Sequence, residues 1–138
     1  MNPLIGKKVL GVYLADDGQA IKFDVENGSP IIAQVDADCC SHTWIEYVET
    51  PENMLGIVTM VENIDMPVRS KDIEYGLIQF YGCKIHTEKG SSLLDYRNES
   101  NGYYGGNLSW PGEHYYGGVF GQNISAVLRN EGYWRKIA

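Results

Sequence analysis

The stretch QAIKFDVENGSPIIAQV, residues 19–35, decides the fold class. Over residues 19–26 apolar side chains alternate with polar ones, as in a strand with one buried face. Asn27-Gly28 follows, and this dipeptide favours a tight β-hairpin turn because both residues tolerate positive φ. Residues 31–35 supply the returning strand, and residues 7–14 supply the strand before. The pattern predicts an antiparallel meander at the start of the chain.

Further strands are expected at 57–64, 74–87 and 92–97. The long segment 74–87 contains Gly76 and Gly82, and either glycine is a candidate for a bend or bulge. A short segment at 124–128 and a final one at 133–136 complete the pattern. The residues expected in the core share apolar strand or helix faces: Phe23, Val25, Trp44, Tyr47, Ile57, Val61, Ile78 and Phe80.

Two short helices are expected between the strands. Ser41 is a candidate cap for a helix over 42–48, in which Trp44, Tyr47 and Val48 share one face. Pro51 suits the first position of a second helical turn. The sequence therefore predicts an α+β fold, a mainly antiparallel β-sheet with one or two short helices packed on one face.

The chain of 138 residues is expected to form a single domain. Within it, residues 5–110 form the β-rich unit, and 111–138 form a C-terminal extension that we interpret as an assembly element. No apolar run has the length of a membrane helix, and residues 1–17 do not resemble a signal peptide. We expect a cytoplasmic protein.

The cysteines are expected to be reduced and metal-free. Cys39 and Cys40 are neighbours and poor disulfide partners, which leaves Cys83 as an odd third. The alternative is a metal site around Cys39, Cys40 and His42, but the spacing of these residues does not match a zinc site. Buried thiols beside a helix cap are the favoured interpretation, and no cofactor is expected.

The net charge of −7 argues against non-specific nucleic acid binding. Residues 1–90 carry 14 acidic and 7 basic residues, whereas residues 91–138 carry 4 of each. An anionic ligand is therefore expected to bind through a few placed cations in the C-terminal third.

Catalytic motifs are absent from the sequence, which contains no nucleophile elbow, no phosphate-binding loop and no metalloprotease helix. We expect the protein not to be an enzyme. A cysteine–histidine pair that meets only in the folded chain remains the alternative, as in a cryptic phosphodiesterase.

The strongest candidate for a binding site is the segment 97–116. Arg97 enters a loop rich in Asn, Ser and Gly, and such a loop suits a phosphate. Neighbouring aromatic rings offer faces for a nucleobase. The alternative is that the glycines only form turns while the tyrosines fill a sheet. The candidate ligand-binding residues are Arg97, Asn98, Asn101, Tyr103, Tyr104, Trp110, Tyr116 and Arg129.

Three segments carry a resemblance: DCCSHTW (38–44), YGCKIHTEKG (81–90) and YRNESNGYYGG (96–106). Together they resemble a largely uncharacterised family of small phage-encoded domains, over roughly residues 5–106. Size, β-rich composition and the arginine–aromatic loop are also similar to phage anti-Thoeris sponge proteins. That resemblance implies a homo-oligomer that binds cyclic ADP-ribose isomers, and in some sponges cyclic oligonucleotides, at subunit interfaces without catalysis.

The favoured function is therefore a non-enzymatic anti-defence protein in the cytoplasm of an infected bacterium, which sequesters a cyclic nucleotide immune signal. The alternative is an acidic inhibitor that binds a host protein through its charged first 90 residues, and a cryptic phosphodiesterase comes third. Light scattering is expected to show a dimer or larger assembly, because exposed aromatic residues are enriched at contact surfaces.

Overall fold

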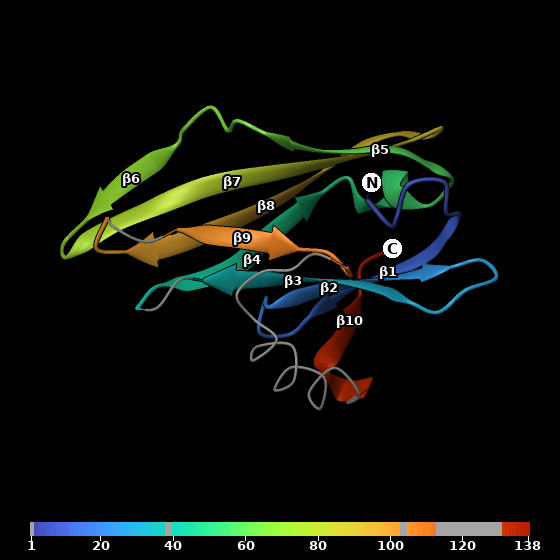
Figure 1. Cartoon of the computed structure of the whole chain (residues 1–138), viewed down its shortest axis with the longest axis horizontal. Helices are drawn as coiled ribbons and strands as arrows, with labels where there is room; N and C mark the ends of the chain where they lie inside the picture. Colours follow the sequence, from blue (N-terminus) through green and yellow to red (C-terminus); the bar gives the residue numbers. More distant parts are fainter. Residues whose placement is uncertain (1, 38–39, 103–104, 113–130) are drawn as a thin grey trace.

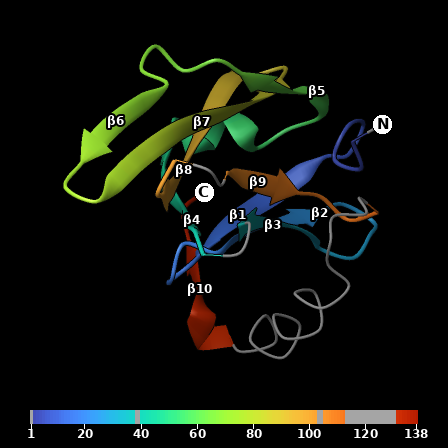
Figure 2. The ribbon, with the colours of Figure 1, turned by 60° about the vertical axis from the view of Figure 1, so that its left-hand side comes forward.

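Two antiparallel sheets face each other across one core (Figures 1 and 2). The computed structural model describes residues 2–37, 40–102, 105–112 and 131–138. The first sheet has the order β10-β1-β2-β3-β9, with β1 (Val9–Ala15), β2 (Ala20–Val25), β3 (Ile31–Ala37), β9 (Gly106–Ser109) and β10 (Trp134–Lys136). The second has the order β4-β8-β7-β5, with β4 (His42–Glu49), β5 (Val58–Ile64), β7 (Gly76–Thr87) and β8 (Gly90–Ser100), and β6 (Ser70–Ile73) pairs with β7.

The predicted meander is confirmed. Strands β1, β2 and β3 pair in sequence order, and Asn27 has a φ of 58° in the β2–β3 turn. The sheets meet at a corner, where the Gly6 N–H donates to the Val58 carbonyl, the Val58 N–H donates to the Lys7 carbonyl, and Lys8 pairs with Ile57 in an isolated β-bridge. The β-rich part of the fold prediction is therefore correct.

The expected helix over 42–48 is wrong, because this segment is strand β4, paired antiparallel with β8. Thr43 and Ile45 point into the core, and an irregularity between Ile45 and Tyr47 leaves Tyr47 45% exposed. β-Branched and aromatic residues suit a strand, and pairing with β8 outweighs a helical pattern of only three side chains. The chain therefore has no α-helix among its described residues, only the 3-10 turns η1 (Pro51–Met54) and η2 (Glu131–Tyr133).

The second predicted helical turn is present as η1, with Pro51 in its first turn. The predicted irregularity in β7 is not found against β8, because the β7–β8 register runs unbroken from Leu77 to Thr87. On its other edge, β7 changes partner from β6 to β5 between Gln79 and Gly82.

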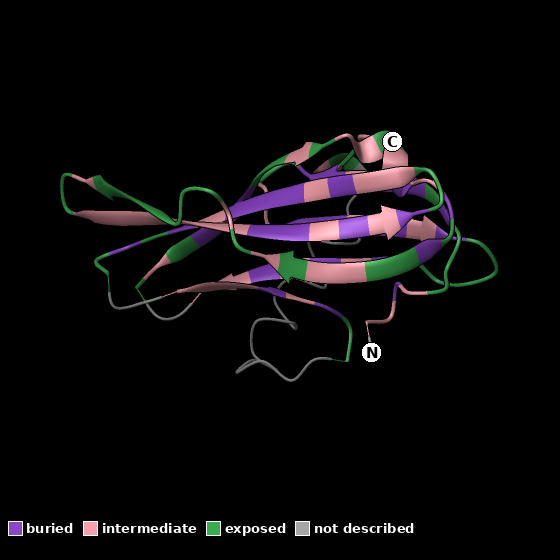
Figure 3. Cartoon of the chain, turned by 90° about the horizontal axis from the view of Figure 1, so that it is seen from above, coloured by how far each residue is buried: buried purple, intermediate pink, exposed green. Residues whose placement is uncertain are grey.

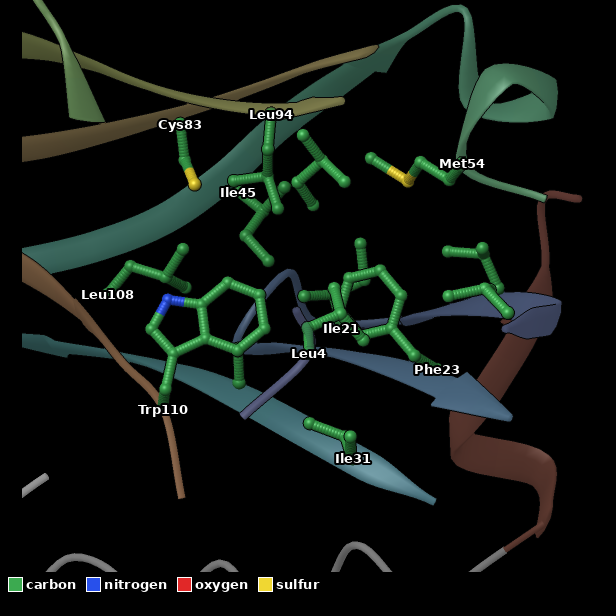
Figure 4. Close-up of a cluster of buried hydrophobic side chains, with 14 of the residues drawn as sticks. Leu4, Ile21, Phe23, Ile31, Ile45, Met54, Cys83, Leu94, Leu108 and Trp110 are labelled. Atoms are coloured by element: carbon green, nitrogen blue, oxygen red, sulfur yellow. The ribbon is translucent and has the colours of Figure 1, made fainter. Parts of the chain in front are cut away.

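The core lies between the sheets (Figure 4), and buried residues concentrate in the middle of the strands (Figure 3). Phe23 and Val25 are buried as predicted. Ile57 is 49% exposed and Tyr47 lies outside, so these two core predictions are wrong. The other four expected core residues, Trp44, Val61, Ile78 and Phe80, are partly buried. The largest buried ring that the core prediction missed is Trp110, which stacks on Phe23 with centroids 5.8 Å apart.

The end of the chain joins the first sheet. Strand β10 pairs with β1, and the Tyr133 hydroxyl donates a hydrogen bond of 2.6 Å to Asp17 Oδ1 in the β1–β2 turn. The predicted segment 124–128 lies outside the described residues. No helix among the described residues is long and apolar enough to cross a membrane.

Of the two thiols expected to be buried, Cys40 is exposed and Cys39 lies outside the described residues, whereas Cys83 is buried. The helix cap expected beside them is replaced by the start of β4. The described residues contain no group of three or more side chains suited to a metal ion.

Candidate functional site

Strand alternation separates the two neighbouring site candidates Arg97 and Asn98. Even-numbered residues of β8 point into the core, and odd-numbered residues point to the outer face of the second sheet. Arg97 therefore faces outward with 27% of its side chain exposed, whereas Asn98 is fully buried. The two side chains cannot contact the same ligand.

Two carboxylates and an aromatic ring position the Arg97 guanidinium. Its Nε donates to Asp95 Oδ1 at 3.1 Å, and Nη1 lies 3.8 Å from Glu46 Oε1. Its central carbon sits 4.6 Å from the centroid of the Phe80 ring, within the range of a cation–π contact. Within the part of the chain that the structure describes, its terminal amino groups donate no hydrogen bond, and their one ion pair is the 3.8 Å contact of Nη1 with Glu46.

The Phe80 contact follows from the sheet register, because Phe80 and Arg97 are direct partners across β7 and β8. Side chains of directly opposed residues lie on the same face of a sheet. Arg97 therefore lies over the Phe80 ring. This contact could be predicted only if the β7–β8 register were known.

The β5–β6 loop covers this part of the outer face and creates a pocket of about 490 Å³. Met66, Pro67 and Val68 form its apolar wall. Met66 reaches over Gly82, where an added Cβ would lie 2.6 Å from its sulfur atom. Gly82 therefore lets the loop pack close to the sheet. The complete lining is Met66, Pro67, Val68, Ser70, Lys71, Phe80, Asp95 and Arg97.

The pocket combines groups that bind different parts of one ligand. An apolar wall and the Phe80 ring suit a flat ring system, and the Lys71 ammonium and Arg97 guanidinium suit an anionic group. Asp95, whose side chain is 3% exposed, holds the guanidinium through the hydrogen bond to Nε. The arrangement can bind a small aromatic anion.

Asn98 belongs to a polar cluster between the sheets. Its Nδ2 donates to Thr43 Oγ1 at 2.9 Å and to Ser41 Oγ at 3.1 Å, and its buried Oδ1 has no hydrogen-bond partner among the described residues. Gly106 lies against the same cluster, because a Cβ there would approach Thr43 Oγ1 to 2.6 Å. In this structure Asn98 ties β8 to the start of β4.

Asn101 and Trp110 lie in two other places. Asn101 is exposed and lines a shallow hollow with His42 and Tyr75, near the end of the β6–β7 hairpin. Trp110 is part of the core, and its edge lines a cleft with Asn63 and Asn107. Tyr103, Tyr104, Tyr116 and Arg129 lie outside the described residues.

The structure thus places the four described candidates in four environments. Only Arg97 lies in the pocket on the outer face, and its companions there were not predicted: Met66, Val68, Lys71 and Phe80. Alternation within β7 and β8 indicated which residues share a face, but it does not reveal the register between them. The sequence also did not indicate that the β5–β6 loop packs over the outer face of the sheet.

The fold is an antiparallel β-sandwich with a pocket of about 490 Å³ on one outer face. Residues 2–110 match the family model described as Domain of unknown function (DUF7448), and the chain belongs to this family. Neither the curated proteins nor the solved structures contain a match to the chain.

Proposed function

We propose that the protein sequesters a small nucleotide in the Arg97 pocket and leaves this ligand chemically unchanged. The observation that carries this proposal is the Arg97 guanidinium, which stacks over Phe80 and lines the pocket together with Lys71. A phosphate would accept hydrogen bonds from Arg97 and Lys71, and the base would pack against Phe80 and the Met66–Val68 wall.

The finer proposal rests on the resemblance to anti-Thoeris sponges. The ligand is then a cyclic ADP-ribose isomer or a cyclic oligonucleotide, and the protein acts against bacterial defence in the cytoplasm of a phage-infected cell. A pocket of about 490 Å³ encloses one nucleotide unit. A ligand with two such units requires a second wall, and in a homo-oligomer a neighbouring subunit would supply it.

The role of Lys71 tests the pocket directly. Lys71 is exposed and makes no ion pair with another described residue, so Lys71→Ala is expected to leave the melting temperature unchanged. The affinity of the variant for a phosphate-bearing nucleotide should be about 10-fold or more lower, since a hydrogen bond to a charged group contributes about 1.5–3 kcal/mol. Calorimetric titration with cyclic ADP-ribose and with AMP measures the change.

Lys89→Ala is the matched control, because it removes the same charge from the exposed β7–β8 turn. Equal weakening in both variants would show only a general loss of positive charge. No weakening in Lys71→Ala would place the ligand outside this pocket.

Retention of ligand distinguishes the three candidate functions. The purified protein is incubated with a cyclic nucleotide, separated from unbound ligand and heat-denatured, and the released molecules are identified by mass spectrometry. Intact ligand supports sequestration, and altered ligand indicates a phosphodiesterase. No retained ligand contradicts sequestration and favours the acidic inhibitor of a host protein.

A further inference from the structure

The outer face of the second sheet also carries a serine, a histidine and a glutamate joined by two hydrogen bonds. Ser91 Oγ lies 2.8 Å from His86 Nδ1, and Glu62 Oε2 lies 2.7 Å from His86 Nε2. The three residues come from the adjacent strands β8, β7 and β5. This order of hydroxyl, imidazole and carboxylate is the arrangement that activates a nucleophilic serine.

For a neutral imidazole, the two hydrogen bonds select one tautomer of the His86 ring. An ionised carboxylate only accepts hydrogen bonds, so the Glu62 contact places a proton on His86 Nε2. In the neutral ring Nδ1 then carries a lone pair, and the Ser91 hydroxyl donates to it. This is the direction of proton transfer that general-base catalysis requires.

Strand pairing holds the three side chains in place. His86 and Ser91 are direct partners in the β7–β8 register. On β5 the register partner of His86 is Met60, and Glu62 lies two residues further along the strand. Two side chains also hold the backbone of the cluster: Asn53 Nδ2 donates to the Ser91 carbonyl at 3.1 Å, and Thr59 Oγ1 donates to the His86 carbonyl at 3.2 Å. The cluster is therefore positioned by the sheet.

The cluster is accessible and has a cation nearby. The His86 side chain is 28% exposed, and Ser91 is partly exposed. Lys84 is two residues before His86 on the same face of β7 and pairs in register with Glu62, and it makes no ion pair with another described residue. Its ammonium group gives positive charge to the face on which an oxyanion would form.

We propose that Ser91 is a nucleophile that is acylated by carboxylic esters, with His86 as its general base and Glu62 as the positioning residue for the ring. Ser91 Oγ attacks the ester carbonyl carbon and forms a C–O bond, while its proton passes to His86 Nδ1. The tetrahedral adduct collapses, the C–O bond to the leaving group breaks, and the proton on Nδ1 passes to the departing alkoxide. Water then attacks the acyl-serine with the same base, releases the carboxylic acid and restores Ser91.

The site is separate from the Arg97 pocket and does not depend on the proposed nucleotide binding. Along β7, Phe80 lines the pocket and His86 holds the cluster, six residues apart. Ser91 is partly exposed on the outer face of the sheet, so the proposed substrates are small activated esters that can reach this face. Ser92, the next residue, is buried and donates to the Thr50 carbonyl, so it is not expected to react.

The test uses the full chain with p-nitrophenyl acetate and a fluorophosphonate probe. Release of p-nitrophenol measures acylation, and peptide mapping locates the modified residue. Ser91 is expected to carry the modification. Ser91→Ala should abolish it, and His86→Gln and Glu62→Gln should slow it about 100-fold or more. Glu62→Asp should recover part of the rate, which a purely structural role of Glu62 does not predict.

Ser29→Ala is the matched control, because Ser29 is an exposed serine in the β2–β3 turn far from His86 in the sequence. Its rate should equal that of the unmodified chain. Absence of label on Ser91, or label that persists in His86→Gln, would overturn the proposal. Melting temperatures of all variants, together with mapping on the unmodified chain, keep the result decisive if one variant folds poorly. Nucleotide affinity in Glu62→Gln should be unchanged, so this proposal and the proposed function fail independently.

Discussion

At the scale of single residues, Arg97 has a structural role in addition to the binding role that we propose. The sequence indicated only a candidate ligand contact for Arg97. The side chain also pairs with the buried Asp95 carboxylate and covers Phe80. Removing it leaves a charge without its partner in a site that water reaches poorly, and such a charge destabilises the folded state.

We therefore expect Arg97→Ala to lower the free energy of unfolding by about 1–3 kcal/mol. The double variant Asp95→Asn with Arg97→Ala should be more stable than Arg97→Ala alone, because no unpaired carboxylate remains. Urea unfolding of the two single variants and the double variant gives the coupling between the residues. Additive effects would show that Asp95 and Arg97 act independently.

The sequence predicted Trp44 in the core and Trp110 in a binding site, but in the structure Trp110 is the core residue and Trp44 is only partly buried. Trp110 is buried against Phe23, whereas Trp44 is partly exposed, stacks on His42 and donates its indole N–H to Glu46. Trp110→Ala should cost about 3–5 kcal/mol by leaving a cavity. Trp44→Ala should cost clearly less, and thermal or urea unfolding of both variants compares them. A larger loss for Trp44→Ala would contradict the observed packing.

At the scale of elements, Tyr133 attaches the end of the chain to the first hairpin. Its hydroxyl donates to Asp17 beside Asp16, and η2 leads directly into β10. Burial raises the pKa of the Tyr133 phenol above its usual value, and the hydrogen bond to Asp17 and the negative charges of Asp17 and Asp16 raise it further. The fold therefore stabilises the neutral phenol.

This pKa shift predicts a loss of stability in alkali. Below the pKa of an unfolded tyrosine, about 10, both states are protonated and the contribution of Tyr133 is complete. Above it, the unfolded phenol ionises before the folded one does, so the free energy of unfolding falls as pH rises. The stability difference between the unmodified chain and Tyr133→Phe should therefore shrink between about pH 7 and about pH 11 in urea unfolding.

Tyr75→Phe serves as the control for this pH series, since Tyr75 is 88% exposed and lies at the β6–β7 turn. Its unfolding curves should follow those of the unmodified chain at each pH. A difference for Tyr133→Phe that stays constant with pH would contradict the raised pKa.

At the scale of the whole molecule, the two sheets leave several large apolar side chains outside the core. Leu10, Ile57, Met60, Val68 and Tyr75 are all exposed. The β6–β7 hairpin also projects beyond the body of the sandwich, with no fully buried residue between Ser70 and Tyr81 (Figures 1 and 3). Apolar and aromatic surface of this kind is typical of contact regions.

We expect light scattering to show a dimer or larger assembly at micromolar concentration. An oligomer would supply the second wall that a ligand of two nucleotide units requires. Cyclic ADP-ribose should bind more weakly when dilution dissociates the assembly, and titrations at several protein concentrations measure this. A monomer with full affinity would contradict the interface part of the proposal.

The sequence by itself determined the local elements. Alternating apolar residues and Asn27-Gly28 specified the β1–β2–β3 meander, and Pro51 specified η1. These features depend on neighbours along the chain, through backbone conformation and the two-residue period of a strand. The short helix pattern at 42–48 failed because three apolar positions do not distinguish a helix from a strand.

Only the tertiary structure decided which side chains meet. The register of β8 against β7 sets Arg97 over Phe80 and Ser91 beside His86, and β5 brings Glu62 to the same ring. Packing of Met66 over Gly82 completes the pocket. Pairing between strands that are distant in sequence depends on burial of the whole core, and a one-residue shift would move every side chain of a strand to the opposite face. For this reason the sequence indicated Arg97 as a site residue, while the residues around it became known only from the folded chain.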